Sequence, residues 1–140
     1  MARILGDLIV KNVGPGLWEV MEDIEYHVGH ENSDEVIIVK KGLVTDFASI
    51  PFGLRNILPK DGAWSVGSVF HDQCYRFRGV LPEGFFRGPV MVYSQKDCDK
   101  IFDEINQLKK VSWWQRTLIY SALRLFGWIS FSKNKPGRKV

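Results

Sequence analysis

Three segments of the first forty residues are rich in apolar and β-branched residues, which is typical of β-strands. These segments are residues 3–11, 17–28 and 35–41. Turn sequences, NVGPG and GHENSD, separate these segments. In the second segment Trp18, Val20, Ile24 and Tyr26 share one strand face, and the opposite face is mostly acidic. The pattern therefore predicts an antiparallel sheet with one buried face, in which the second and third segments form a hairpin.

This pattern stops after Gly42, and residues 43–62 contain two prolines and two glycines between apolar anchors. This composition predicts an ordered loop. Helical spacing begins at Ala63, and the residues of its apolar stripe are Val66, Phe70, Cys74 and Phe77. His71 and Tyr75 form the adjoining stripe of the same predicted helix. A glycine-rich excursion follows and is predicted to end in a short strand at residues 89–93.

Two more helices are predicted in the last third of the chain. Ser94 is a good N-cap with Asp97 three residues later, and the helix at residues 96–110 is expected to bury Ile101, Ile105 and Leu108. The last helix, at residues 113–127, begins after a capping box of Ser112 and Gln115 and ends at Gly127. Its inward residues are predicted to be Trp114, Leu118, Ala122 and Leu125.

The order of strands before helices predicts an α+β fold, with an N-terminal antiparallel β hairpin or sheet, an ordered loop and three helices. A length of 140 residues with 45% apolar residues suits one domain, which we place at residues 1–131. Residues 132–140 are predicted to form a flexible basic tail that could contact an acidic partner. The net charge of +3 is too small to indicate nucleic-acid binding over the whole surface.

The two cysteines, Cys74 and Cys98, do not form a disulfide framework or a metal-binding pair by their spacing, and we expect both to be reduced. The apolar stretch at the N-terminus is too short and too soon interrupted for a signal peptide. No apolar run approaches the length that spans a membrane. Synthesis in a bacterial-type cytoplasm is therefore expected.

His71 is the strongest candidate for chemistry, because an imidazole beside an apolar stripe needs hydrogen bonds for both nitrogens. Asp72 cannot orient it, since neighbouring residues on a helix point about 100° apart; an ion pair with Arg76 is expected for Asp72 instead. The carboxylate partner of His71 is predicted to be Asp46 or Asp99. Structural roles remain open for both, an Asx-type turn for Asp46 and a favourable helix-dipole position for Asp99.

Four blocks of the chain resemble a small phage-associated family named domain of unknown function 1353. The matching residues are Gly42, Thr45, Asp46, Phe47, Ala48, Ser49, Ile50 and Pro51, then His71, Asp72 and Tyr75, then Asp99 and Phe102, and last Tyr120, Arg124 and Gly127. The likeness spans about residues 18 to 128. It implies a bacteriophage or prophage protein, located in the virion after synthesis in the bacterial host cytoplasm, and it brings no established activity.

The HDQCY segment also resembles the catalytic helix of calcium-dependent secreted phospholipases. This likeness implies His71 as general base, Asp99 as its orienting carboxylate and Tyr75 as support. It implies Asp72 as a calcium ligand, so calcium is the one cofactor to consider. The glycine-rich calcium loop and the flanking disulfides of those enzymes are not found in the sequence, so the likeness rests on one helix.

Two functions remain for this sequence. In the first, which we favour on sequence alone because a complete set of catalytic groups is not recognisable, the protein is a tail or particle component that binds other virion proteins. A buried His-Asp network then specifies the fold, and a homo-oligomer is a further option for its assembly. In the second, His71 activates water with Asp46 or Asp99 behind it and Tyr75 in support, and the protein hydrolyses a lipid or cell-envelope substrate during host entry or lysis.

Overall fold

The computed structural model describes residues 3–45 and 63–133, with side chains as far as Leu125, and shows strands followed by helices. The predicted α+β fold is thereby confirmed. The strands are β1 (Arg3–Leu5), β2 (Val10–Gly14), β3 (Leu17–Val20), β4 (Ile24–His27), β5 (Val36–Val39), β6 (Val44–Thr45) and β7 (Phe86–Arg87). The helices are α1 (Ser65–Arg76), α2 (Gln95–Leu108) and α3 (Trp113–Lys133).

The strands form two antiparallel sheets, one with the order β1-β4-β5-β7 and one with the order β2-β3-β6. Pairing of β4 with β5 confirms the predicted hairpin. The first two predicted strands are each divided between the two sheets, which corrects the sequence prediction. At the crossing, Gly6 has φ +102°, and a Cβ there would lie 3.0 Å from the carbonyl oxygen of Asp23. The two segments therefore pass closely where both leave one sheet for the other.

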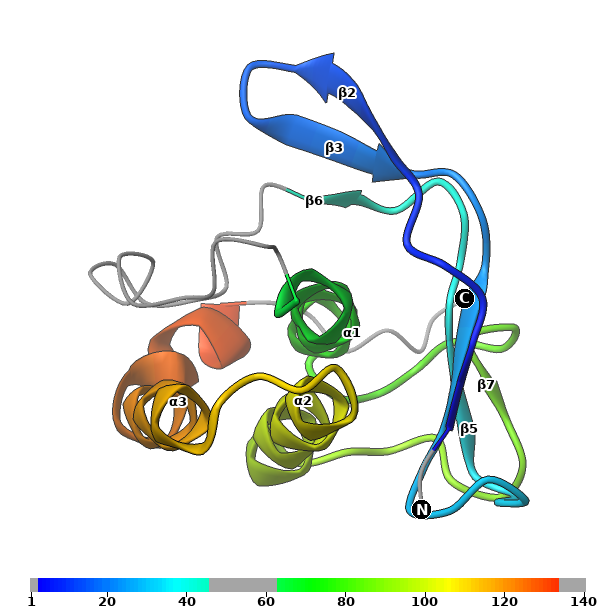
Figure 1. The fold of residues 1–140 in the computed structure, drawn as a ribbon. Coiled ribbons are helices and arrows are strands. Elements are labelled where there is room, and N and C mark those ends of the chain that lie inside the picture. The colour runs from blue at the N-terminus through cyan, green and yellow to red at the C-terminus, as the bar shows by residue number, and fades with distance from the viewer. Residues whose placement is uncertain (1–2, 46–62, 134–140) are drawn as a thin grey trace.

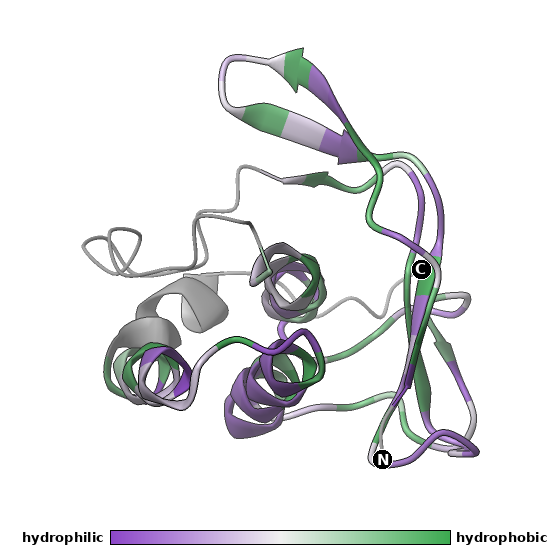
Figure 2. Ribbon diagram, viewed as in Figure 1, coloured by the Kyte–Doolittle hydropathy of each residue, from purple (hydrophilic) through white to green (hydrophobic). Residues whose placement is uncertain are grey.

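The helices lie in layers on one side of the four-stranded sheet (Figure 1). α1 contacts both β5 and α2, whereas α3 packs on α2 and α1 on the side away from this sheet. The ribbon of α2 is largely hydrophilic where it faces away from the sheet (Figure 2), as expected for an amphipathic helix. The buried core between sheet and helices includes Ile24, Tyr26, Ile37, Val39, Phe70, Cys74, Ile101 and Ile105.

The predicted start of α2 is confirmed in detail. The backbone N–H of Asp97 donates to Ser94 Oγ at 3.1 Å, and the backbone N–H of Ser94 donates to Asp97 Oδ2 at 3.2 Å. This reciprocal pair is a capping box, which satisfies backbone donors that the helix itself cannot. At the start of α3 the Ser112 hydroxyl donates to the Gln115 side-chain oxygen at 2.6 Å.

The predicted face of α3 is wrong. Trp114, Leu118 and Leu125 are 51%, 44% and 65% exposed, and between Trp113 and Leu125, where side chains are described, the buried residues are Ile119 and Leu123. Apolar residues occur on more than one side of α3, so spacing alone does not determine which side packs. The predicted end at Gly127 is also wrong, because the helix continues to Lys133. A glycine within a helix costs about 1 kcal/mol relative to alanine and does not by itself end it.

The strand predicted at residues 89–93 is not formed. β7 lies earlier, at Phe86–Arg87, and Val92 makes an isolated bridge with Val80. Gly88 explains the difference, because its φ is +105° and a Cβ at this position would lie 1.8 Å from the carbonyl oxygen of Asp34. The chain turns away from the sheet at this glycine.

Within the described ranges, none of the helices combines the length and apolarity needed to cross a bilayer. Residues 134–140, which make up most of the predicted basic tail, lie outside the described residues.

Candidate functional site

A buried polar centre lies where the three helices meet. His71 belongs to α1, Asp99 to α2 and Arg124 to α3. The distance between His71 Nε2 and Asp99 Oδ1 is 2.8 Å, and both side chains are 0% exposed. Of the two carboxylates predicted as partners of His71, Asp99 is therefore in contact with it. The other, Asp46, lies outside the described residues.

Asp99 accepts hydrogen bonds from two further side chains. The hydroxyl of Tyr75 donates to Asp99 Oδ1 at 2.6 Å, and Nη1 of Arg124 donates to Asp99 Oδ2 at 2.8 Å. The guanidinium balances the charge of a carboxylate that would otherwise be costly to bury. Arg124 reaches inward from the surface, since its side chain is 34% exposed. Asp99 thus links α1, α2 and α3.

These contacts determine which nitrogen of His71 carries the proton. A carboxylate that already accepts from Tyr75 and Arg124 is an acceptor, so Nε2 must donate to it. In the neutral imidazole the other nitrogen, Nδ1, then carries a lone pair. This atom is buried and has no hydrogen-bond partner among the described residues. His71 is therefore oriented like a general base, with one nitrogen fixed by a carboxylate and the other ready to accept a proton.

The hydroxyl of Tyr75 remains a hydrogen-bond donor to Asp99. Burial raises the pKa of its hydroxyl well above the ordinary value of 10.0, and the hydrogen bond to Asp99 raises it further. The hydroxyl consequently stays protonated at physiological pH.

The ring of His71 is held between aromatic neighbours. Its centroid lies 4.0 Å from that of Tyr75 and 5.1 Å from that of Phe102. Phe102 comes this close because Gly67 on α1 has no side chain, and a Cβ there would lie 2.6 Å from Phe102 Cδ1. The imidazole is thus fixed by packing as well as by its hydrogen bond.

A disulfide joins Cys74 to Cys98, with the two Cα atoms 6.0 Å apart. The prediction that both cysteines are reduced is therefore wrong, as is the expectation that no disulfide flanks the His-Asp pair. The two residues are 24 positions apart in sequence and come together because α1 packs on α2. They directly precede Tyr75 and Asp99, so the bridge clamps the helices beside the polar centre.

Asp72 points away from this chemistry toward Arg76. Arg76 Nη2 donates to Asp72 Oδ2 at 2.8 Å, which confirms the predicted ion pair one helical turn apart. Calcium would need several further oxygen ligands around Asp72. No group of three or more histidine, cysteine or acidic side chains is assembled in residues 3–45 and 63–125.

Three polar residues of the centre were not predicted from spacing. Arg124 matches the last block of the family pattern, but nothing in its neighbourhood in sequence indicates that it reaches Asp99. Ser68 and Asn106 are fully buried, and their side-chain polar atoms have no hydrogen-bond partner among the described residues. Ser68 lies three residues before His71 on α1, on the same side of the helix.

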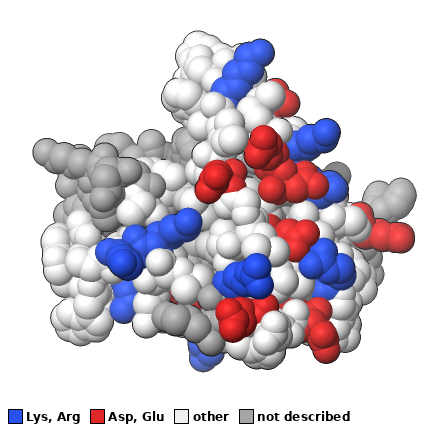
Figure 3. All heavy atoms as spheres, turned by 45° about the vertical axis from the view of Figure 1, so that its right-hand side comes forward, with Lys and Arg blue, Asp and Glu red and all other residues white. Residues whose placement is uncertain are grey.

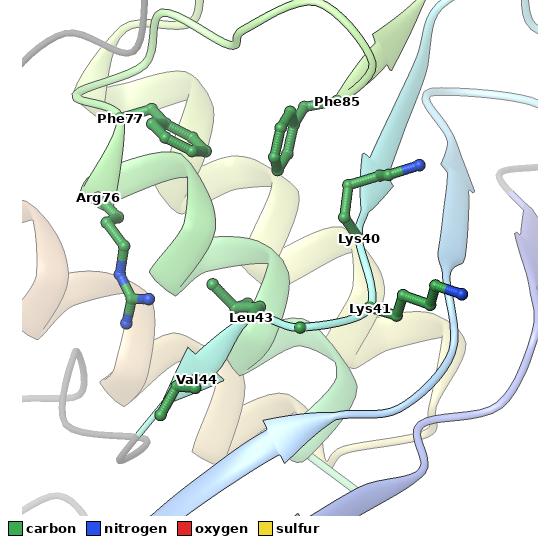
Figure 4. A pocket seen from close by; sticks show the side chains of 8 residues that line it. Lys40, Lys41, Leu43, Val44, Arg76, Phe77 and Phe85 are labelled. Carbon is green, nitrogen blue, oxygen red and sulfur yellow. The ribbon is translucent and has the colours of Figure 1, made fainter.

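A pocket of about 440 Å³ lies between α1 and the loop that precedes β6 (Figure 4). Its lining residues are Lys40, Lys41, Gly42, Leu43, Val44, Arg76, Phe77 and Phe85. Phe77 and Phe85 make an edge-to-face contact in its lining, with ring centroids 5.1 Å apart, and the two lysine ammonium groups point away from them (Figure 4). Neither His71 nor Asp99 lines this pocket.

Comparison with protein-family models matches residues 18–123 to the family described as "Protein of unknown function (DUF1353)". Neither the comparison with curated proteins nor the comparison with solved structures found a match.

Proposed function

The chain belongs to the DUF1353 family, and we propose that it is a small hydrolase in which His71 is the general base and Asp99 orients it. The observation that carries this proposal is the buried, unpaired Nδ1 of His71 opposite the Nε2 contact with Asp99. A histidine with a purely structural role is expected to have both nitrogens bonded, because an unpaired buried polar atom costs about 1–3 kcal/mol. A base that receives its proton from substrate or water must keep one nitrogen unbonded.

The proposed reaction is hydrolysis of an ester. Nδ1 of His71 accepts a proton from water while the water oxygen attacks the ester carbonyl carbon. The imidazolium that forms is stabilised by the Asp99 carboxylate, 2.8 Å from Nε2. When the tetrahedral intermediate collapses, the bond to the alcohol breaks and the imidazolium returns its proton to the leaving oxygen. Tyr75 and Arg124 hold the carboxylate in place throughout.

The proposed substrate class is a lipid or another ester of the cell envelope. It is supported by the likeness of the His-Asp helix to secreted phospholipases, which the disulfide beside Asp99 strengthens. We also propose that the protein acts in a phage particle, as the family likeness implies. A disulfide persists outside the reducing cytoplasm, which is consistent with a virion location after synthesis in the host.

The alternative function is that of a virion component that binds other virion proteins, with the same network as a structural link. The observation that favours it is the burial of both His71 and Asp99 at 0% exposure. A sealed, charge-balanced network can specify a fold without turnover. The two proposals differ in what the loss of His71 does to activity and to assembly.

A lipid hydrolysis assay tests the hydrolase. We expect the purified protein to release fatty acid from vesicles of phosphatidylglycerol and phosphatidylethanolamine. The variants His71→Asn and Asp99→Asn should each lower the rate by about 10²-fold to 10⁴-fold, the usual contribution of a general base. Asp103→Asn is the matched control, since Asp103 lies on the same helix and pairs with Arg116 at 3.3 Å.

Circular dichroism and thermal unfolding distinguish lost chemistry from lost folding in these variants. Hydrolysis by His71→Asn at the wild-type rate would contradict the proposal, as would absence of lipid hydrolysis by the wild-type protein. Mass spectrometry of purified particles and assembly of His71→Asn phage then test the alternative. Loss of particles in this variant, together with an inactive wild-type protein, would favour the structural function.

A further inference from the structure

The outward side of α3 presents an apolar stripe to solvent. Trp113 is 72% exposed, Trp114 51%, Leu118 44% and Leu125 65%. On a helix with 100° per residue these four side chains lie within an arc of about 140°, which they share with Thr117, Ser121 and Arg124. The opposite side of the helix packs inward through Ile119 and Leu123. Two adjacent tryptophans and two leucines on one exposed helix side exceed the scattered single apolar residues that are ordinary on a protein surface.

The part of the sequence that contains α3 has basic residues but no acidic ones. None of the 16 acidic residues lies beyond Glu104, whereas eight of the 19 basic residues do. These are Lys109, Lys110, Arg116, Arg124, Lys133, Lys135, Arg138 and Lys139. On the face that Figure 3 brings forward, by contrast, acidic side chains lie interspersed with basic ones. The last quarter of the chain is therefore a purely cationic segment built around an apolar stripe.

Two of these cations are available beside the tryptophans. Lys109 and Lys110 are exposed in the short link between α2 and α3, and neither makes an ion pair with any residue in the described part of the chain. Lys110 has φ +64°, a conformation that turns the chain between α2 and α3. The lysines and the tryptophan pair thus come from one short segment.

We propose that α3 binds the surface of an anionic lipid bilayer and lies along it with the Trp113, Trp114, Leu118 and Leu125 side inserted. Tryptophan has an apolar ring and a polar N–H, and it concentrates at the boundary between headgroups and acyl chains. Exposed lysines are attracted to anionic headgroups, each contributing while it lies within about 10 Å of the surface. An apolar helix side flanked by cations is the pattern of a helix that lies in the interface.

Charge disfavours a second copy of this chain as the occupant. A two-fold interface through α3 would bring together two segments that each carry eight cations and no anion, and only Arg116 and Arg124 of these cations pair with carboxylates of α2 among the described residues. In such a dimer, the last quarter of one copy would offer no acidic side chain to pair with the cations of the other and so fix their alignment. An anionic bilayer offers an apolar interior to the apolar side chains and negative headgroups to the cations. The inference rests on the exposed apolar side chains of α3 and on the cations beside them, so it holds whether or not the His71 centre is catalytic.

Vesicle co-sedimentation tests this inference with the full chain. We expect the protein to bind vesicles of phosphatidylglycerol and phosphatidylcholine mixed equally, and to bind pure phosphatidylcholine at least about tenfold more weakly, with salt reducing the binding. The double variant Trp113→Ala with Trp114→Ala should bind the mixed vesicles at least about tenfold more weakly. The control is Met91→Ala with Val92→Ala, whose parent residues are 41% and 61% exposed on another segment.

A second measurement needs no substitution. Brominated lipids in the same mixed vesicles should quench tryptophan fluorescence of the wild-type protein, because Trp113 and Trp114 would enter the headgroup boundary. Absence of quenching, or equal binding of the tryptophan variant and the wild type, would overturn the inference. So would sedimentation velocity that shows a dimer in solution, if the tryptophan substitutions dissociate it.

Discussion

At the scale of single residues, Asp99 is the residue that connects the candidate site to the fold. Its two oxygens accept from His71, Tyr75 and Arg124, and these donors come from two other helices. The same contacts orient the imidazole and join the three helices. Asp99 therefore has a structural and a proposed chemical role, and variants at this position must be tested for folding and activity together.

Gly67 is a second residue on which the site depends, because it has no side chain. We predict that Gly67→Ala lowers the free energy of unfolding by about 1–3 kcal/mol, the usual cost of overpacking a core. The added Cβ would lie 2.6 Å from Phe102 Cδ1, and Phe102 is fully buried beside His71. Alanine is favoured over glycine in a helix by about 1 kcal/mol, which offsets part of the loss.

Urea denaturation measures this difference. Lys100→Ala is a suitable control because Lys100 is exposed on α2, and its effect should stay within about 0.5 kcal/mol. A Gly67→Ala protein as stable as the wild type would mean that Phe102 can move aside and that α1 and α2 are less tightly packed than the coordinates indicate.

At the scale of elements, the α1–α2 pair forms the rigid centre of the molecule. Its two helices share the Cys74–Cys98 bridge, the His71–Asp99 contact and the close approach at Gly67. Gln73 extends this unit to the sheet, because its Nε2 donates to the carbonyl oxygen of Ile38 at 2.8 Å. α3 joins the pair through Arg124 and through Ile119 and Leu123, and it leaves its other side exposed.

The bridge should contribute measurably to stability. We predict that the double variant Cys74→Ser with Cys98→Ser has a free energy of unfolding lower by about 3 kcal/mol, because the disulfide restricts the unfolded chain over 24 residues. Chemical denaturation of this variant is the measurement. Wild-type protein treated with reductant should show the same loss, and a thiol assay should find no free cysteine before reduction. Equal stability with and without the bridge would contradict the prediction.

At the scale of the whole molecule, charge is divided between a sheet with many carboxylates and a cationic helical end. Several carboxylates on the sheet are paired. Arg87 donates to Glu25 at 2.9 and 3.2 Å, linking β7 to β4, and these hydrogen bonds hold the pKa of Glu25 below its ordinary value of 4.5. Asp103 on α2 behaves in the opposite way, since burial raises its pKa despite the nearby Arg116.

The direction of the Glu25 shift predicts part of the acid response. Because its folded pKa is lowered, its contribution to stability is present above about pH 4.5 and is lost as the pH falls through the folded value. Glu25→Gln should therefore lose less stability than the wild type between about pH 5 and pH 3. The difference should be at most about 0.5 kcal/mol, because the pair is partly exposed.

Denaturation curves measured across this pH range provide the comparison. Glu83→Gln is the control, since Glu83 is exposed and makes no ion pair within the described residues. If Glu25→Gln and the wild type lost the same free energy of unfolding between about pH 5 and pH 3, the Arg87 contact would be too weak to affect stability.

The sequence by itself determined features that depend on neighbours along the chain. Alternation and helical spacing predicted the β4–β5 hairpin, the buried stripe of α1, the capping box at Ser94 and the Asp72–Arg76 pair. Each of these is encoded within a few residues, because strand periodicity, helix periodicity and capping are local properties. The sequence identified His71 and Asp99 as candidate site residues, but it did not give the distance between them.

Only the tertiary structure decided how the predicted strands divide between sheets and which side of a helix is buried. Two long strands were divided between sheets at Gly6, and α3 buried Ile119 and Leu123 in place of its equally apolar opposite side. The contact of His71 with Asp99, the contact of Arg124 with Asp99 and the pairing of Cys74 with Cys98 all depend on how distant segments pack. Spacing along one segment carries no information about the segment that will pack against it, and that is the physical reason.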